Sequence, residues 1–364
     1  MYNLTIRKTL MVKKAILLIG FVALFFSSCT DQKIIYAHGT LDSVFKKAKE
    51  ENKWLLVIFE NEGCQACENL VSELENKSEL KDKLSDDFLV YENKLNAIGN
   101  EYLSRALYSI ASPAIYIFNA DGVLINMLVG FKTSKEIQRA IEEGQNLKPV
   151  SGGFASRLNL DGRDLIDFGN LVLRSARTLE KKSSDEAQLR QTAADLKRSL
   201  NMQTYFFNNY LLAKVYQRLG DTEKAKQFAA EAMTFTDSFS IFLYQPLRNE
   251  LRFLLDSRFE KEDEAFAVLD KNNYDFAVQK IGSRPEATFK VKNSGKKPLI
   301  VEKVFGNCDC MDFEWTKTPI MPGETGAIKV VYRADHQGGF SKTVYIFSNA
   351  LNTPSVFSIK GVID

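Results

Sequence analysis

The chain has 364 residues, of which 45% are hydrophobic and 26% are charged, and its formal net charge is +2. This is an ordinary globular composition with enough length for two or three domains. The near-neutral charge gives no support to nucleic-acid binding. With only two histidines, His38 and His336, a zinc enzyme or a histidine-activated nucleophile also has little support.

Residues 1–28 have the pattern of a secretory signal peptide. A basic stretch at 11–14 precedes an apolar run at 15–26, and small residues lead to Cys29. The ending Ser27-Ser28-Cys29 is similar to a bacterial lipobox, which implies that Cys29 carries a lipid. The alternative is an N-terminal transmembrane anchor, although the apolar run is shorter than the ~20 residues needed to span a bilayer.

Either interpretation places the rest of the chain outside the cytoplasm. The preferred one is an exported protein held in the bacterial cell envelope by its lipid, facing the periplasm or the cell surface. The signal peptide carries four basic residues and no acidic one, so its removal would leave a net charge of −2. Residues 29–39 form a linker. The remaining cysteines make two close pairs, Cys64/Cys67 and Cys308/Cys310, which an oxidising compartment favours as disulfides.

The first pair lies where a buried strand meets a helix. Cys64 and Cys67 follow the apolar run 54–59 and begin a helical pattern. Because a helix N-terminus favours a thiolate, Cys64 is the expected attacking sulfur and Cys67 the resolving one. About 50 residues later, Ser112-Pro113 opens a second apolar run at 114–118 and would close the site from the facing strand.

At these residues the chain resembles the thioredoxin-like superfamily, over a domain at residues 40–147. The predicted elements follow in the order of that fold: helix 41–48, strand 54–59, the cysteine-bearing helix, strand 88–91, helix 101–107, strand 114–118, strand 123–129 and a helix from Ser134. The resemblance implies that Pro113 is cis, that Ser112 and Pro113 hold an extended substrate segment, and that protein thiols and disulfides are the partners. It implies no cofactor.

The site departs from the family at two positions. Gly63 stands where the family usually has tryptophan, and Ile58 stands where it buries an aspartate. Local negative charge at Glu60, Glu62 and Glu68 opposes the helix dipole. We therefore expect a reductase or isomerase rather than a strong oxidant. The alternative is a structural C-x-x-C disulfide on a thioredoxin scaffold.

Residues 148–264 are predicted to be helical. Apolar residues recur at helical spacing over 165–176 and 187–200. The stretch 212–232 matches one tetratricopeptide repeat, with small alanines where two helices approach and Gly220 at the turn. One repeat cannot bury its own face, so it must stack on its helical neighbours. The segment either binds a partner protein or only joins domains.

Residues 270–364 have the short alternating runs of a β-sandwich, with five predicted strands at 287–292, 298–304, 326–332, 341–347 and 355–361. The runs Asn293-Ser294-Gly295, Met321-Pro322-Gly323 and Phe347-Ser348-Asn349 resemble the immunoglobulin-like envelope family called domain of unknown function 1573. That family has Cys-Gly-Cys where this chain has Cys308-Asp309-Cys310. This candidate second disulfide either exchanges electrons with the first pair or is an inert loop staple.

The sequence thus predicts a multidomain α/β, then α, then β protein. The leading functional hypothesis is a lipid-anchored thiol-disulfide oxidoreductase that acts on protein disulfides through Cys64 and Cys67. The alternative is a redox-silent scaffold that uses its helical and β-sandwich domains to bind a partner protein. A four-thiolate zinc site built from both cysteine pairs is disfavoured, because C-x-C is not a usual zinc-ligand spacing, so no metal is predicted.

Overall fold

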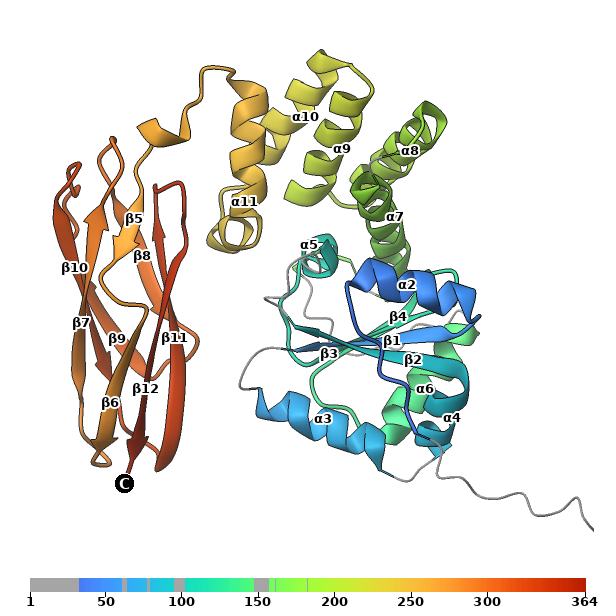
Figure 1. Cartoon of the computed structure of the whole chain (residues 1–364), viewed down its shortest axis with the longest axis horizontal. Coiled ribbons are helices and arrows are strands. Elements are labelled where there is room, and N and C mark those ends of the chain that lie inside the picture. Colours follow the sequence, from blue (N-terminus) through green and yellow to red (C-terminus); the bar gives the residue numbers. More distant parts are fainter. Residues whose placement is uncertain are drawn as a thin grey trace, which may run out of the picture.

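The computed structural model describes residues 33–60, 64–76, 79–94, 102–146, 157–160, 162–181 and 183–364. They form an α/β domain within 41–145, a helical segment at 162–255 and a sandwich at 267–363 (Figure 1). This order confirms the predicted fold class. The predicted signal peptide and the lipidation site Cys29 lie outside the described residues. No helix within those residues has the length and apolar character needed to cross a membrane.

The α/β domain is built on a four-stranded sheet in the order β2-β1-β3-β4. The strands are β1 (Trp54–Glu60), β2 (Phe88–Lys94), β3 (Ala114–Phe118) and β4 (Leu124–Val129). β1 runs parallel to β2 and antiparallel to β3. Every residue of β3 is buried, because helices cover both faces of the sheet. This explains the uninterrupted apolar runs in the sequence.

Each face of this sheet has its own helices. Helices α3 (Gln65–Glu75), α4 (Glu79–Asp87) and α6 (Ser134–Gln145) contribute to the apolar cluster on one face. On the other face lie α2 (Leu41–Glu50) and α5 (Tyr102–Leu107). Helix α4 was not predicted from the sequence. This short helix offers only Leu80 and Leu84 as buried apolar side chains, which is too few to show a period.

The helical segment contains α7 (Gly162–Glu180), α8 (Glu186–Met202), α9 (Phe206–Arg218), α10 (Thr222–Met233) and α11 (Ser238–Leu255). Helices α9 and α10 form the predicted hairpin, and Gly220 turns it with a φ of 76°, a value that favours glycine. Ala225, Ala229 and Ala232 are buried along α10, where small side chains allow the close approach to α9. Assignment of the hairpin to the tetratricopeptide class remains a prediction.

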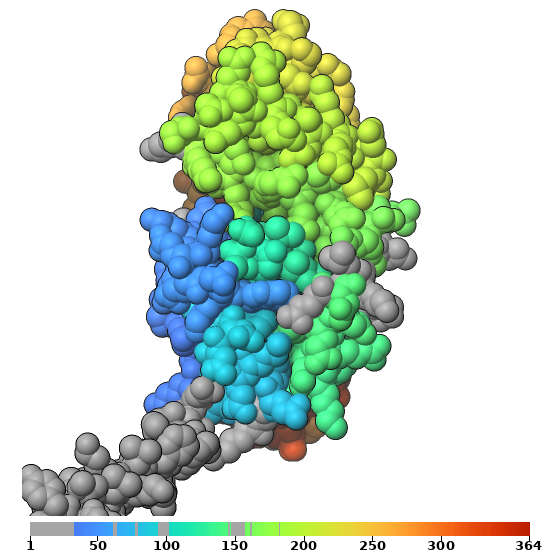
Figure 2. Space-filling view, turned by 90° about the vertical axis from the view of Figure 1, so that its right-hand side faces the viewer, coloured from blue at the N-terminus to red at the C-terminus, as the bar shows by residue number. Residues whose placement is uncertain are grey.

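One hydrophobic core joins the α/β domain to the helical segment. Helix α7 packs against α5 and β4, and Gly169 makes this contact possible because a Cβ there would lie 2.9 Å from the Leu107 side chain. The Asn170 side chain accepts a hydrogen bond from the Leu124 N–H and donates one to its carbonyl, so it pairs with the open edge of β4. Figure 2 shows the two parts in direct contact.

Two buried tyrosines complete this junction. Tyr205 donates a hydrogen bond to the carbonyl of Ala106, and Tyr244 donates one to the carbonyl of Arg105, each at 2.8 Å. Both carbonyls lie in the last turn of α5, where a helix has no further N–H groups to offer them. The rings of Tyr205 and Tyr244 lie in the shared core. The tyrosines therefore fix α9 and α11 onto α5.

The sandwich has two four-stranded sheets, β5-β7-β10-β9 and β6-β12-β11-β8. The five predicted strands correspond to β7 (Glu286–Asn293), β8 (Val301–Gly306), β10 (Thr325–Tyr332), β11 (Gly338–Ser348) and β12 (Ser355–Ile363). Three strands were not predicted from the sequence: β5 (Ala267–Leu269), β6 (Asn273–Gln279) and β9 (Met311–Trp315). These are edge strands with a single buried apolar side chain each, so they lack the alternation that marks β7.

Helix α11 also holds the sandwich. Gln245 and Asn249 both donate side-chain hydrogen bonds to the carbonyl of Leu351, in the turn between β11 and β12. Phe242 on α11 meets Tyr345 on β11 edge to face, with 5.3 Å between ring centroids. The helix thus contacts the α/β domain with Tyr244 and the sandwich with Phe242.

Replacing Tyr244 tests this junction. Tyr244→Ala should lower the free energy of unfolding by about 3–5 kcal/mol, because it empties a fully buried aromatic site. Tyr244→Phe keeps the ring but leaves the Arg105 carbonyl without its donor, at a cost of about 1–3 kcal/mol. Urea unfolding followed by circular dichroism measures both. A Tyr244→Ala protein as stable as wild type would contradict a shared core.

Candidate active site

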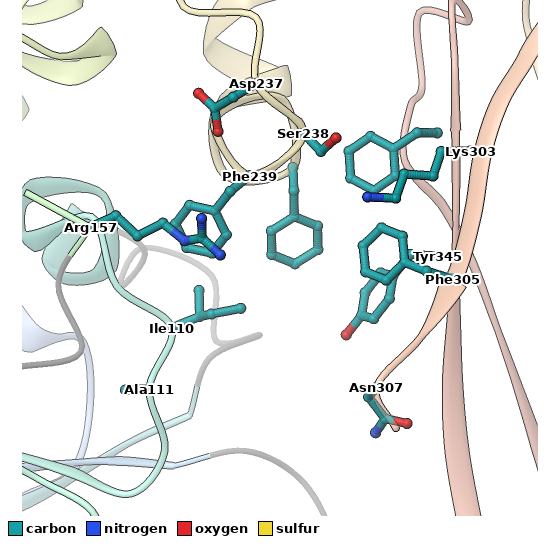
Figure 3. A pocket seen from close by; sticks show the side chains of 12 residues that line it. Ile110, Ala111, Arg157, Asp237, Ser238, Phe239, Lys303, Phe305, Asn307 and Tyr345 are labelled. Atoms are coloured by element: carbon teal, nitrogen blue, oxygen red, sulfur yellow. The ribbon is translucent and has the colours of Figure 1, made fainter. Parts of the chain in front are cut away.

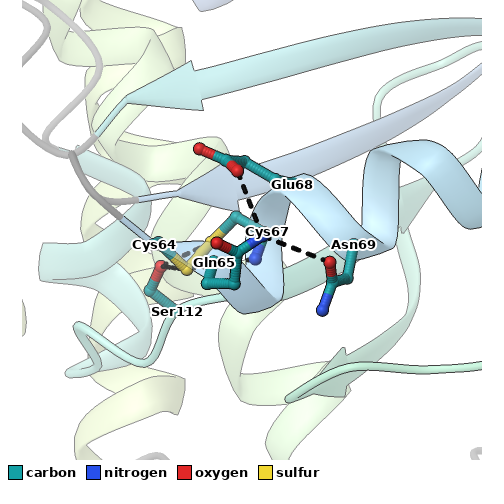
Figure 4. Close-up of a disulfide and its surroundings, with 6 residues drawn as sticks. All are labelled: Cys64, Gln65, Cys67, Glu68, Asn69 and Ser112. Carbon is teal, nitrogen blue, oxygen red and sulfur yellow. Dashed lines mark hydrogen bonds between the residues drawn. A yellow bond between two sulfur atoms is a disulfide. The ribbon is translucent and has the colours of Figure 1, made fainter. Parts of the chain in front are cut away.

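Cys64 and Cys67 lie at the N-terminus of α3, directly beyond the buried strand β1 (Figure 4). Cys64 is the N-cap residue, and its sulfur accepts a hydrogen bond from the Cys67 N–H at 3.2 Å. The two sulfurs are bonded to each other, with 5.2 Å between the Cα atoms. The unpaired N–H groups of this first turn and the helix dipole favour negative charge at a sulfur here.

The two cysteines differ in exposure. Cys67 is 1% exposed and packs beneath the first turn of α3, whereas Cys64 is only partly buried. A partner molecule therefore reaches the sulfur of Cys64 first. This asymmetry is the one required of an attacking and a resolving thiol.

Ser112 and Pro113 face the cysteines from the segment that leads into β3. The Ser112 hydroxyl lies 3.2 Å from the Cys67 sulfur and 3.6 Å from the Cys64 sulfur. The Ser112–Pro113 peptide bond is cis, and Pro113 accepts a hydrogen bond from the Gly130 N–H at 2.8 Å. The structure thus brings together all four residues that the sequence analysis chose, because β3 lies antiparallel beside β1.

Ile58 lies on β1, six residues before Cys64, and Glu68 lies on α3 directly after Cys67. Ile58, which stands in place of the family's aspartate, is fully buried and pairs in register with Ile115. Glu68 is exposed on α3 and accepts a hydrogen bond from Gln65 at 3.2 Å. The positions of Glu62 and Gly63 lie outside the described residues. Among these neighbours, the Ser112 hydroxyl is the polar group that touches both sulfurs.

Two features of the site were not predicted from the sequence. Ser112 was expected to bind substrate, with no role for its hydroxyl, although a serine beside the proline was the available signal. Phe131 was not predicted either. It is 44% exposed and follows Gly130, whose N–H bonds the Pro113 carbonyl.

The second cysteine pair lies in the sandwich, in the turn between β8 and β9. Cys308 and Cys310 are bonded to each other and pack partly buried against the sandwich core. Within the described part of the chain, no cluster of three or more histidine, cysteine, aspartate or glutamate side chains is placed to hold a metal ion.

Comparison with protein families divides the chain in the same way. Residues 41–145 match a family model described as a thioredoxin-like domain. Residues 267–363 match one described as a protein of unknown function, DUF1573. The chain therefore contains a thioredoxin-like domain and a DUF1573 domain, as the resemblances predicted. No curated protein matches the chain.

Similar solved structures each cover one part of the chain. A protein of unknown function from Porphyromonas gingivalis is 15% identical over 29% of this chain and 50% of its own, with a TM-score of 0.26. This chain thus spans half the length of that protein. A PapD-like domain of human CEP192 is 7% identical over 29% of this chain and 91% of its own, with a TM-score of 0.26. A mutant thioredoxin from Halobacterium salinarum is 20% identical over 31% of this chain and 90% of its own, with a TM-score of 0.24.

The difference in exposure predicts an order of labelling. After complete reduction, a limiting amount of iodoacetamide should modify Cys64 before Cys67, because the sulfur of Cys67 is covered. Mass spectrometry of the proteolysed protein assigns the label to each cysteine, and full labelling of both in urea is the control. Equal labelling of the two in the native protein would contradict their assigned roles.

Proposed function

We propose that this protein is a lipid-anchored thiol-disulfide oxidoreductase of the bacterial cell envelope, which reduces or isomerises disulfides in other proteins. One observation carries the proposal. A partly exposed cysteine at a helix N-terminus, a covered cysteine one turn away and a serine hydroxyl that touches both sulfurs meet in a thioredoxin-like domain.

The reaction begins with both cysteines reduced. The Cys64 thiolate attacks one sulfur of the substrate disulfide, the substrate S–S bond breaks, and the other substrate sulfur leaves as a thiolate that takes up a proton. The product is a mixed disulfide between Cys64 and the substrate. Cys64 is suited to this step because its sulfur is accessible and the first turn of α3 stabilises its charge.

Resolution needs no further partner. Cys67, as a thiolate, attacks the Cys64 sulfur of the mixed disulfide and releases the second substrate thiolate, so the Cys64–Cys67 bond seen here forms. Two electrons pass from the dithiol to the substrate. In isomerisation, a substrate thiol displaces Cys64 instead, and the dithiol is regenerated.

Ser112 acts on both steps through its hydroxyl. A hydroxyl within reach of both sulfurs donates a hydrogen bond to whichever one carries the negative charge. This matters most at Cys67, because its side chain is 1% exposed and a thiolate there is shielded from water.

The direction of electron flow follows from the charges around the pair. A strong oxidant needs a reduced form that its surroundings stabilise strongly. Here the carboxylate of Glu68 lies on the first turn of α3 and opposes the dipole at the same helix end. This arrangement supports reduction or isomerisation of substrates rather than their oxidation.

The location rests on the N-terminal sequence. The apolar run at 15–26 and the cysteine at position 29 support export and lipidation. An envelope compartment also agrees with four further cysteines arranged as two bonded pairs.

Insulin reduction tests the chemistry. With dithiothreitol as electron source, the wild-type protein should accelerate insulin reduction, read as turbidity, and Cys64→Ser should fall to the uncatalysed rate because it lacks the attacking sulfur. The matched control is the double variant Cys308→Ser with Cys310→Ser, which removes the other disulfide and should keep the wild-type rate.

The outcome separates two functions. Equal rates of insulin reduction by wild type and Cys64→Ser would contradict the catalytic proposal and favour the redox-silent scaffold. In cells, Cys67→Ala should accumulate mixed disulfides with partner proteins, since nothing then resolves them, and these would identify the substrates.

A second variant isolates the serine hydroxyl. Ser112→Ala removes a hydrogen bond worth about 0.5–1.5 kcal/mol and should slow insulin reduction by up to about tenfold. Ser112→Thr keeps a hydroxyl on the same backbone position and should restore most of the rate. If Ser112→Ala is as fast as wild type, the hydroxyl takes no part in the exchange.

A further inference from the structure

A groove with a cavity volume of about 640 Å³ lies between the three parts of the chain (Figure 3). Ile110 and Ala111 of the thioredoxin-like domain form one wall, and Phe239 and Phe242 of α11 form the roof. The sheet β6-β12-β11-β8 of the sandwich supplies the opposite wall through β8 and β11. No single domain makes this groove. The shared core joins the thioredoxin-like domain to α11, and α11 in turn bonds the sandwich at Leu351.

The groove begins next to the sulfurs. Ala111, which lines it, directly precedes Ser112, whose hydroxyl lies 3.2 Å and 3.6 Å from the two sulfurs. An extended polypeptide advances about 3.3 Å per residue, so a chain held at Cys64 through its own cysteine enters the groove within one or two residues. A covalently bound substrate therefore places its neighbouring side chains there.

The sandwich wall is aromatic. Phe305 on β8 and Tyr345 on β11 have ring centroids 5.4 Å apart and are both partly exposed. Phe242 of α11 meets Tyr345 from the roof. In Figure 3 the Tyr345 hydroxyl points into the groove, and burial raises the pKa of Tyr345, so this group remains a hydrogen-bond donor. Such a wall suits an aromatic or large aliphatic side chain with polar backbone around it.

The net charge of the groove lining is positive, because two cations, Arg157 and Lys303, stand against one acid, Asp237. The guanidinium of Arg157 lies 4.2 Å from the ring centroid of Phe239, and the ammonium of Lys303 lies 5.0 Å from that of Phe305. Neither cation forms an ion pair with another described residue. The acid of the groove, Asp237, is already engaged, since it caps α11 through the Ser240 N–H and accepts a hydrogen bond from Tyr108. An occupant with a carboxylate complements this charge.

We propose that this groove selects the substrates of the oxidoreductase: protein segments with an aromatic or large aliphatic side chain and a carboxylate within a few residues of the disulfide cysteine. The proposal rests on the proposed exchange at Cys64 and assigns to the DUF1573 domain the second wall of the substrate site. Binding to the groove and exchange at the sulfurs are separable, so each has its own measurement.

Three synthetic peptides test the selectivity. All have the same length and carry one cysteine as a mixed disulfide with thionitrobenzoate, followed by Phe-Glu, Phe-Lys or Ser-Ser. The reduced protein releases the coloured thionitrobenzoate, and Cys67 then resolves the peptide. In single turnovers with excess reduced protein, the second-order rate constant of wild type should be about tenfold higher for the Phe-Glu peptide than for the Ser-Ser peptide.

A charge reversal on the sandwich provides the decisive variant. Lys303 is exposed, so Lys303→Glu should fold normally, lose the preference for Phe-Glu and prefer Phe-Lys instead. Lys292→Glu reverses an equally exposed charge on β7 in the other sheet and should behave as wild type. Ellman's reagent carries no peptide, and all three proteins should reduce it at the same rate.

The same peptides with serine in place of cysteine separate binding from chemistry. Fluorescence anisotropy with the oxidised protein should show tighter binding of the Phe-Glu peptide to wild type than to Lys303→Glu, even if no disulfide is ever exchanged. Equal binding and equal rate constants for the three peptides, or a Lys303→Glu protein with wild-type preference, would overturn the proposal that the groove selects substrates. If the protein instead exchanges with no disulfide but still binds the peptides selectively, only the oxidoreductase proposal is contradicted.

Discussion

The arrangement of this molecule depends on two carbonyl groups at the end of α5. Buried carbonyls without hydrogen-bond partners are costly, and the last turn of a helix cannot supply partners. Tyr205 from α9 and Tyr244 from α11 supply them, while their rings fill the apolar core between the domains. Burial strongly raises the pKa of both hydroxyls, so they remain donors. The helical segment is thereby tied to the α/β domain by polar and apolar contacts at one place.

The same segment of chain leads to the sulfurs. Beyond α5, Tyr108 has a φ of 48°, which is unfavourable for a residue with a side chain. Its ring stacks on Tyr244 with 5.7 Å between centroids, and its hydroxyl bonds Asp237 at the start of α11. Burial and the Asp237 carboxylate raise the pKa of Tyr108 to about 12. These contacts hold Tyr108 in its strained conformation, four residues before Ser112, so the packing of the helical segment sets the position of the hydroxyl at the active site.

Elements whose apolar side chains repeat at a regular spacing could be predicted from the sequence. Buried strands such as β1, the helix start at the first cysteine and the strong alternation of β7 all follow from side-chain periodicity. It failed where local pattern is weak, at the short helix α4 and the edge strands β5, β6 and β9. It also could not reveal the groove, because Ala111, Phe242 and Tyr345 are far apart in the sequence and meet only through the tertiary packing around α11.

The two cysteine pairs show why a motif alone does not define chemistry. Both are bonded and lie close in sequence, yet their environments differ. Cys64 and Cys67 have aligned backbone dipoles and a hydroxyl to receive negative charge. Cys308 and Cys310 lie in a turn between two strands, and strand dipoles largely cancel. A thiolate therefore gains less stabilisation in the sandwich than on α3.

The sandwich contributes surface near the candidate active site. Asn307, next to Cys308, lines the same groove as Ala111. The first pair therefore has the environment that the proposed exchange requires, and the domain that carries the second pair forms a wall of the proposed substrate groove.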